Sequence, residues 1–134
     1  AAILRVKLKY LDEDNQKRRE IANYYCENIN NKNVILPSSN KKLPIRQALN
    51  NVWHLFVIRT KNRDKFYDYL SKNGVQTVIH YPIPPHKQEA YKDWNELNFM
   101  ITEKIHDEVL SLPISSVLDT AEIAEIISLV NEYK

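Results

Sequence analysis

Apolar residues recur at helical spacing along residues 1–31, a stretch without proline or glycine. They form two stripes, one at Leu4, Leu8 and Leu11 and the other at Ile21, Tyr25 and Ile29. The polar run 12–20 between the stripes is either a solvated face or a slight bend. The pattern predicts one long helix over residues 1–31.

The start of this pattern carries no helix-start signal. The chain does not open with Met, and no Ser, Thr, Asp or Asn precedes the first apolar positions. Ala1 is already part of the periodicity. We therefore expect the helix to continue from a preceding domain of a longer protein. The alternative is a helix that frays from a processed terminus.

The middle of the chain alternates between strand and helix patterns. Residues 52–59 are apolar on both faces, which is typical of a strand buried on both sides. A helix is predicted next, from Asn62 as its N-cap to Gly74, which tolerates the left-handed backbone at a helix stop. The β-branched run 75–81 then predicts a second strand. Together, 52–81 form a βαβ unit, in which parallel pairing would require a right-handed crossover.

The remaining segments predict shorter elements. Residues 30–51, rich in Asn, Ser, Lys and Pro, predict a connector in which 34–36 fits a short edge strand. Residues 82–134 predict helices and a short strand: a helical turn at 88–94, a helix at 102–110, a strand or turn at 111–114, and a last helix opened by a capping box at Asp119 and Glu122. The whole chain, 1–134, is expected to be one α/β (α+β) domain, a small mixed sheet with packed helices.

The run 75–81 leads into a proline-rich segment that carries the candidate binding residues. Three prolines within 82–85 lack an N–H and fix φ, so the chain leaves the sheet as a stiff, extended segment. His80, Tyr81 and His86 lie on this exit, and polar groups on a stiff strand end suit a binding site. The alternative is that His80 is a hydrogen-bonded sheet histidine and that the prolines only end the strand.

Composition narrows the classes of function. The 134 residues, 43% hydrophobic and 27% charged, suit one globular domain. The net charge of +2 gives no electrostatic footprint for nucleic acid or an anionic membrane, and no apolar run is long enough to span a bilayer. Cys26 is the only cysteine, so no internal disulfide can form and the cytoplasm is the expected compartment. A single glycine excludes a glycine-rich phosphate loop.

The residue types give no self-contained catalytic or metal site. The four histidines are His54, His80, His86 and His106. His80 and His86 are six positions apart across three prolines with no cysteine or acid close to them, so a zinc site is not expected. No lysine lies in an apolar run that would lower its pKa toward Schiff-base chemistry. We therefore expect no catalytic, cofactor-binding or metal-binding residue within the chain.

Five segments occur in an order that resembles a known family. They are 1–8 (AAILRVKL), 18–22 (RREIA), 53–59 (WHLFVIR), 79–88 (IHYPIPPHKQ) and 110–114 (LSLPI). Together they resemble the C-terminal part of the DegT/DnrJ/StrS family of sugar-nucleotide aminotransferases, over essentially the whole chain. Met100 departs from a proline common in that family, and Ser115 and Ser116 replace a frequent His-Pro, which leaves the substrate open.

The resemblance implies a fold-type I enzyme that uses pyridoxal 5'-phosphate (PLP). The cofactor would be bound by a missing N-terminal domain that carries the Schiff-base lysine, so this chain alone is expected to be inactive. In such enzymes, residues matching His80 and Tyr81 reach the nucleotide-sugar substrate, and His86 and Gln88 are further candidates. Neutral donors and acceptors of this kind orient sugar hydroxyls or diphosphate oxygens.

The function that the resemblance implies for the whole protein is an amino transfer from glutamate to a nucleotide-linked keto sugar. The product would serve a cell-surface polysaccharide or a glycosylated metabolite, and the enzyme would be a homodimer. The sugar carbon and the nucleotide stay open. The alternative is a free-standing α/β regulatory or ligand-binding module without catalysis, in which the edge at 80–88 recognises a small ligand or a partner.

Overall fold

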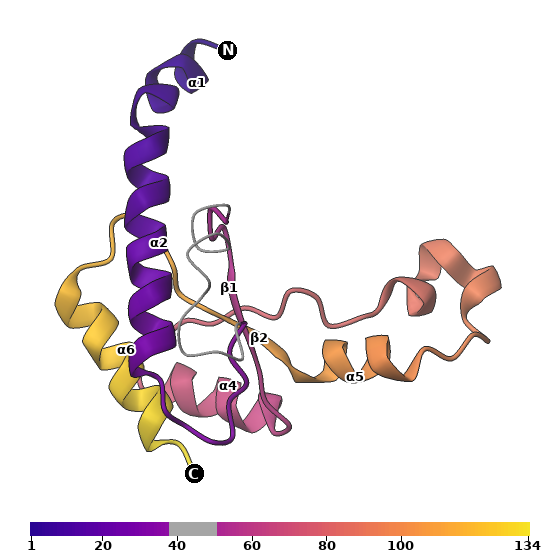
Figure 1. Ribbon diagram of the computed structural model, residues 1–134. Coiled ribbons are helices and arrows are strands. Elements are labelled where there is room, and N and C mark those ends of the chain that lie inside the picture. Colours follow the sequence, from indigo (N-terminus) through magenta and orange to yellow (C-terminus); the bar gives the residue numbers. More distant parts are fainter. Residues whose placement is uncertain (38–50) are drawn as a thin grey trace.

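Three parts make up the molecule in the computed structural model, which describes residues 1–37 and 51–134 (Figure 1). An N-terminal helical shaft rises from a body of helices and strands, and an arm leaves the body on another side. In chain order the described elements are α1 (Ala2–Lys7), the 3₁₀ helix η1 (Leu8–Tyr10), α2 (Leu11–Asn28), β1 (Phe56–Arg59), α4 (Arg63–Lys72), the 3₁₀ helices η2 (Pro85–Lys87) and η3 (Glu89–Trp94), α5 (Met100–Glu108), β2 (Val109–Leu112) and α6 (Thr120–Glu132). Most of the predicted connector 30–51 lies outside the described residues.

The shaft consists of α1, η1 and the first part of α2. The single helix predicted over 1–31 is therefore wrong in its continuity, because a 3₁₀ turn separates α1 from α2. This turn precedes the polar run 12–20, where a bend was one of the two expectations. Helix α2 ends at Asn28 because Ile29 takes an extended backbone, with φ −77° and ψ 116°.

The two apolar stripes of this region have different surroundings. Leu4, Leu8 and Leu11 are exposed along the shaft, and Leu4 is 63% exposed. Tyr25, in the second stripe, is fully buried, and its hydroxyl donates to the carbonyl oxygen of Pro113 at 2.9 Å. Burial raises the pKa of the Tyr25 phenol, because the charged form loses its hydration. The second stripe therefore anchors α2 in the body, while the first has no covering partner among the described residues.

A two-stranded antiparallel sheet, formed by β1 and β2, runs through the body, with Val57 opposite Ser111. One isolated antiparallel bridge extends it at each edge. Ile35 pairs with Arg59 beside β1, and Val78 pairs with Ser111 beside β2. The short edge strand expected at 34–36 is thus reduced to a single bridge, which lies beside β1.

The predicted βαβ unit over 52–81 is wrong in its second strand and in its pairing. Both β1 and α4 form, but 75–81 contributes only the bridge at Val78, next to β2 and not next to β1. Strand β2, all four of whose residues are buried, occupies the edge of β1 instead. Pro82 also lacks the N–H that a longer ladder would need. No parallel pair therefore forms among the described residues.

Local signals around α4 hold in part. Gly74 has φ +83°, the left-handed backbone predicted at the helix stop. Asn62 occupies the N-cap position, but its side chain makes no cap hydrogen bond. Beyond the helix, Val75 and Thr77 are buried and Val78 is exposed, which is the alternation typical of a strand. The segment after Gly74 therefore has a strand-like backbone pattern without a full strand partner.

The later elements lie close to their predicted positions. Helix α5 spans Met100–Glu108 and not 102–110, because Val109 is already extended, with φ −73° and ψ 137°, and begins β2. The capping box of α6 is confirmed. The Asp119 carboxylate accepts from the backbone N–H of Glu122, and the Glu122 carboxylate accepts from the backbone N–H of Asp119.

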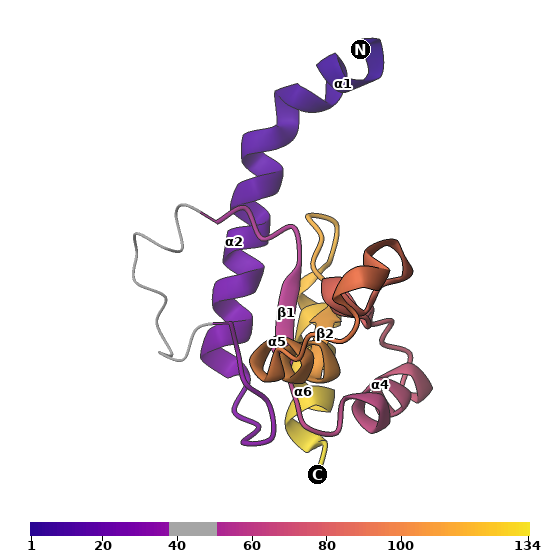
Figure 2. The ribbon, with the colours of Figure 1, turned by 90° about the vertical axis from the view of Figure 1, so that its right-hand side faces the viewer.

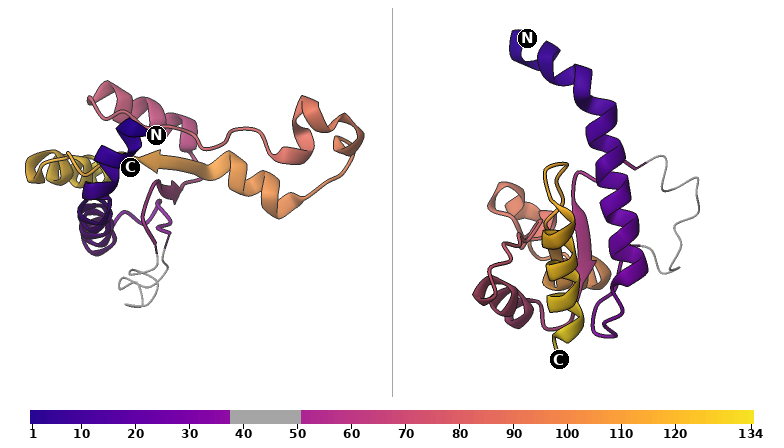
Figure 3. Two further views of the ribbon diagram at one scale, coloured as in Figure 1. Left: turned by 90° about the horizontal axis from the view of Figure 1, so that it is seen from above. Right: turned by 90° about the vertical axis from the view of Figure 1, so that its left-hand side faces the viewer.

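The core lies where α2, α4 and α6 surround the two strands (Figures 2 and 3). Phe56 is fully buried, and its ring centroid lies 5.0 Å from that of Tyr25 and 5.5 Å from that of Trp53. Phe66 of α4 packs on Tyr133 at 4.5 Å. Each fully buried side chain of this kind contributes roughly 1.5–3 kcal/mol. The arm leaves this core on the side away from α6 (Figure 3).

Candidate functional site

The candidate site lies on the arm, which we define as residues 80–108. Its outgoing limb runs from His80 through η2, its tip contains η3, and its return limb is α5, which leads into β2 (Figure 1). Isolated helices this short are not stable by themselves. Contacts between the two limbs therefore maintain the shape of the arm.

His86 joins the two limbs within the arm. It is 3% exposed, and its Nε2–H donates to Oε1 of Glu103 at 2.8 Å. The imidazole also meets the ring of Phe99 edge-on, at 4.9 Å between centroids. The backbone N–H of Phe99 donates to the same carboxylate oxygen at 3.1 Å. The bond from His86, followed by the bond from Phe99, lowers the pKa of Glu103, because both favour the ionised carboxylate.

Asn95 closes the tip of the arm. Its side-chain amide donates to the carbonyl oxygen of His86 at 2.8 Å, and its backbone carbonyl accepts from Nζ of Lys87 at 2.6 Å. Nearby, Nε2 of Gln88 donates to the carbonyl oxygen of Ile83 at 3.2 Å. Both side-chain amides thus satisfy backbone carbonyls, which helps to fix the path of the chain through the tip.

Two arginines of the body fix the inner end of α5. Arg59 of β1 donates from Nε and Nη2 to Oε2 of the buried Glu108, at 3.1 and 2.7 Å. Arg63, the first residue of α4, donates from Nη1 to the carbonyl oxygen of His106 at 2.8 Å. Bonds between ionised partners are the stronger kind, so the Arg59 contact is the main attachment. The base of the arm is therefore tied to the body at two nearby points.

His80 and Tyr81 lie side by side at the base of the outgoing limb. Nδ1 of His80 lies 2.9 Å from Oγ of Ser111 in β2, within hydrogen-bond distance. The carbonyl oxygen of Tyr81 accepts from Nδ1–H of His106 at 2.6 Å, and the peptide bond between His80 and Tyr81 is cis. The His80 and Tyr81 rings meet edge-on at 5.5 Å. Tyr81 is 65% exposed, and its hydroxyl has no hydrogen-bond partner among the described residues.

The four predicted site residues therefore fall into two pairs. His80 and Tyr81 are adjacent, and neither Nε2 of His80 nor the Tyr81 phenol has a hydrogen-bond partner in residues 1–37 and 51–134. His86 and Gln88 direct polar atoms to partners inside the arm. Chemically, the first pair offers hydrogen-bond donors and acceptors that suit the hydroxyl groups of a sugar or the oxygens of a diphosphate.

Sequence analysis missed three residues that hold the outgoing limb. Glu103 and His106 are three positions apart on α5, so one face of this helix contacts both His86 and the backbone of Tyr81. That spacing places both side chains on one face of a helix, but it does not show which segment this face contacts. Ser111 carried no signal of its own beyond its place in the segment 110–114.

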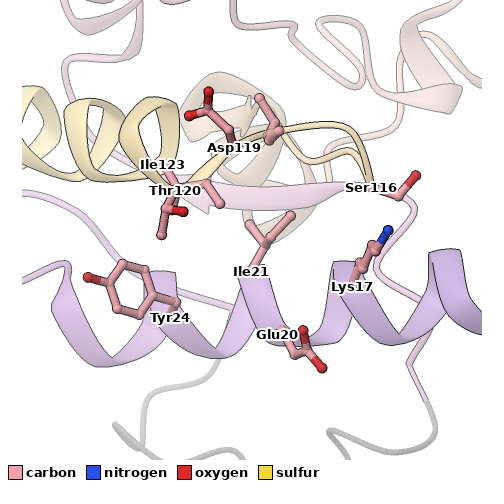
Figure 4. A pocket seen from close by; sticks show the side chains of 9 residues that line it. Lys17, Glu20, Ile21, Tyr24, Ser116, Asp119, Thr120 and Ile123 are labelled. Atoms are coloured by element: carbon pink, nitrogen blue, oxygen red, sulfur yellow. The ribbon is translucent and has the colours of Figure 1, made fainter.

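A separate hollow lies between α2 and the start of α6 (Figure 4). It has a volume of about 520 Å³. Ile21 and Ile123 contribute apolar surface, while Lys17 and Glu20 contribute polar groups. Asp119 also lines it, but its carboxylate is already engaged in the capping box of α6. None of the four predicted site residues borders this hollow.

The described residues contain no cluster placed to hold a metal ion and no enclosed lysine. No group of three or more His, Cys, Asp or Glu side chains in 1–37 and 51–134 is placed to hold a metal ion. Every lysine in these two ranges is exposed, whereas a Schiff-base lysine is activated by an enclosed or charged environment. Within the same part of the chain, each helix is too short or too polar to cross a membrane.

Comparisons with known proteins agree on one family. The model of the DegT/DnrJ/EryC1/StrS aminotransferase family matches residues 1–131. A dTDP-3-amino-3,6-dideoxy-alpha-D-galactopyranose transaminase from Aneurinibacillus thermoaerophilus is 51% identical over 133 residues, which cover 99% of this chain and 35% of that protein.

Solved structures give the same result. The chain superposes on DesV from S. venezuelae with a TM-score of 0.80 and 31% identity, over 98% of this chain and 34% of that one. It also superposes on ntda from Bacillus subtilis, solved with the cofactor PMP bound, with a TM-score of 0.77 and 30% identity, over 91% of this chain and 28% of that one.

The chain thus spans about a third of the length of the relatives that it matches. The superpositions confirm the predicted α/β small-domain fold, with the corrections to its strands given above. The family is PLP-dependent. On the match over residues 1–131, this chain belongs to the DegT/DnrJ/EryC1/StrS aminotransferase family.

Proposed function

We propose that the whole protein is a PLP-dependent aminotransferase that moves an amino group from glutamate to a nucleotide-linked keto sugar. The observation that carries this proposal is the 51% identity to a dTDP-amino-sugar transaminase across 99% of the chain. The relative solved with PMP bound supports the cofactor. The amino sugar would serve a cell-surface polysaccharide or a glycosylated metabolite.

Within that enzyme, this chain is proposed to act as the small C-terminal domain that contacts the sugar nucleotide. PLP, when bound, supplies the electron sink for the chemistry. Every lysine among the described residues is exposed, so the Schiff-base lysine that binds PLP would lie elsewhere in the whole protein. This chain alone is therefore expected to be inactive. His80 and Tyr81 would donate to or accept from the sugar nucleotide and so orient it.

Direct contact of His86 or Gln88 with the substrate stays a prediction. His86 is 3% exposed and donates to Glu103, and the amide of Gln88 donates to Ile83. Both side chains thus support the arm that carries His80 and Tyr81. We propose that any effect of substituting either residue on the sugar substrate arises chiefly through the position of that pair.

We further propose a homodimer in the cytoplasm. The exposed stripe at Leu4, Leu8 and Leu11 supports association, because contiguous apolar surface of this kind is often an interface. The lone Cys26, which is buried, supports a reducing compartment, since it forms no disulfide within the chain.

Substitution of His80 and Tyr81 in the full-length enzyme tests the proposal. His80→Ala and Tyr81→Phe should slow the half-reaction with the keto sugar and spare the half-reaction with glutamate. Loss of a hydrogen bond to a neutral group costs about 0.5–1.5 kcal/mol, and loss of one to a charged group costs roughly 1.5–3 kcal/mol. The expected loss in kcat/KM for the sugar is therefore about tenfold to a hundredfold. The cofactor's absorbance, followed with each substrate alone, separates the two half-reactions.

Matched controls lie outside the arm. His54→Ala and Tyr67→Phe remove the same groups from exposed positions of the body and should leave both half-reactions unchanged. The site assignment fails if both arm variants retain full activity with the sugar. It also fails if both half-reactions fall together with loss of bound cofactor, since that outcome indicates a structural role.

A further inference from the structure

We propose that His106 and Ser111 are positioning residues for the His80–Tyr81 pair, and this inference rests on the proposed function. His106 holds the backbone of Tyr81, and Ser111 holds the ring of His80. Neither residue needs to touch the substrate for its substitution to change how the substrate is bound.

His106 links Tyr81 to the body through two hydrogen bonds in series. Nδ1–H of His106 donates to the carbonyl oxygen of Tyr81 at 2.6 Å, and a carbonyl can only accept, so this nitrogen carries the proton. The carbonyl oxygen of His106 in turn accepts from Nη1 of Arg63 at 2.8 Å. The Arg63 side chain is 14% exposed at the start of α4. The backbone at Tyr81 is therefore held relative to α4 across the base of the arm.

Ser111 is fixed from both sides before its hydroxyl contacts His80. It lies opposite Val57 in the β1–β2 ladder. On the other side, its N–H donates to the carbonyl oxygen of Val78 at 2.8 Å, and its carbonyl accepts from the N–H of Val78 at 3.3 Å. The residue is 5% exposed. The hydroxyl is thus a fixed point on the sheet. Because it engages Nδ1 of His80, Nε2 is the ring nitrogen that remains for another molecule.

The His106 and Ser111 contacts orient His80 and Tyr81, and other contacts also attach the arm to the body. The ion pair between Arg59 and Glu108 joins the arm to the sheet, and the N–H of Thr60 donates to the carbonyl oxygen of Glu108 at 2.9 Å. Loss of the His106 or the Ser111 contact should therefore leave the arm attached while the pair becomes less ordered. A misplaced donor weakens transition-state binding even when the donor itself is present.

The test uses the full-length holoenzyme with His106→Leu and Ser111→Ala. Each should lower kcat/KM for the keto sugar about threefold to tenfold, with the glutamate half-reaction unchanged. His106→Asn keeps a side-chain N–H donor and Ser111→Thr keeps the hydroxyl, so both should restore activity toward the parent value. Lys104→Ala, at an exposed position of α5, is the matched control and should have no effect.

Double variants separate positioning from a general structural effect. If His106 acts through Tyr81, its substitution should cost little more once Tyr81→Phe has removed the hydroxyl, so the two effects should not be additive. An independent contribution of His106 would give the full product of the two losses. Additive losses would therefore overturn the inference.

The remaining outcomes keep this inference distinct from the proposed function. If His80→Ala and Tyr81→Phe impair the sugar half-reaction while His106→Leu and Ser111→Ala do not, the positioning role is wrong and the proposed function stands. If none of the four variants affects that half-reaction, both fail. If both half-reactions are lost and the bound cofactor is lost as well, the residues have a structural role and the inference is overturned. If His106→Leu does not fold, His106→Asn and Ser111→Ala still decide between these outcomes.

Discussion

Three of the four histidines lie in the arm, and each ring contacts a different kind of group. His86 donates to a carboxylate, His106 donates to a backbone carbonyl, and His80 shares a hydrogen bond with a hydroxyl. The first contact involves a partner that loses its negative charge in acid, whereas the other two partners stay neutral. Among these three histidine contacts, only that of His86 depends on the titration of a second side chain.

The lowered pKa of Glu103 predicts that the arm loses order in acid. The bond from His86, followed by the N–H of Phe99, lowers this pKa below its ordinary value of 4.5. A carboxyl group with a depressed pKa stabilises the folded arm above its ordinary pKa, and this contribution is lost as the pH falls through the depressed value. Amide-exchange protection over 80–106 should therefore decrease in that acidic range.

Two variants that replace a carboxylate by a neutral amide, Glu103→Gln and Glu96→Gln, test this prediction. Glu103→Gln removes this titrating group and should reduce the dependence of the arm's protection on pH in that range. Glu96→Gln changes an exposed carboxylate of the same arm and should leave the parent pH dependence intact. An unchanged acid response in Glu103→Gln would show that another group controls the order of the arm.

At the scale of elements, the sequence predicts what depends on neighbours along the chain. The helical spacing predicted for Ile21 and Tyr25 falls within α2, Gly74 has the predicted left-handed backbone after α4, and the predicted capping box at Asp119 forms. The strand predicted at 75–81 fails for a non-local reason. Its β-branched pattern suits a strand, but β2 takes the neighbouring position beside β1, and the competition between two such segments is not visible in either one alone.

Removal of the α6 capping box should destabilise the body. Asp119→Ala leaves the backbone N–H of Glu122 without its 2.8 Å acceptor and also breaks the reciprocal pattern. Loss of such a cap costs about 1 kcal/mol, within a range of roughly 0.5–2. The free energy of unfolding from a urea titration measures the effect, with Asp119→Ser as a variant that keeps a capping oxygen. An Asp119→Ala protein as stable as the parent would show that the cap contributes nothing measurable.

At the scale of the whole molecule, the projecting arm was not predictable from local sequence. Its direction depends on the Arg59–Glu108 ion pair and on the bond from Arg63 to the His106 carbonyl, which join residues 49 and 43 positions apart. His80 and Tyr81 were predicted as candidates because prolines follow them. Their supporting partners, His106 and Ser111, become apparent only when the arm has folded back onto the sheet.

Both projecting parts expose apolar side chains that the body does not cover. Along the shaft, Ile3 is 76% exposed, and Leu4 and Leu8 are each 63% exposed. On the arm, Met100 and Ile101 are each 78% exposed. Contiguous apolar surface is uncommon on soluble monomers and is typical of interfaces. The stripe at Leu4 and Leu8 is therefore a candidate surface for association.

We expect residues 1–134 to self-associate through the shaft. Burial of apolar side chains from water favours association roughly in proportion to the area covered, so a charge at these positions should oppose it. Sedimentation velocity over a concentration series should show a concentration-dependent rise in mass for the parent chain. Leu4→Glu combined with Leu8→Glu should shift the protein toward the monomer. Val117→Glu, at an 85% exposed position in the loop before α6, should not.

A second charged variant decides between the two projecting surfaces. Met100→Glu combined with Ile101→Glu places the same charges on the arm and should leave association through the shaft intact. If association is instead lost only in this variant, the arm is the contact and the shaft assignment is wrong. A parent chain that stays monomeric at every concentration would refute self-association through either surface. The exposed apolar side chains of the shaft and of the arm would then both remain in contact with water.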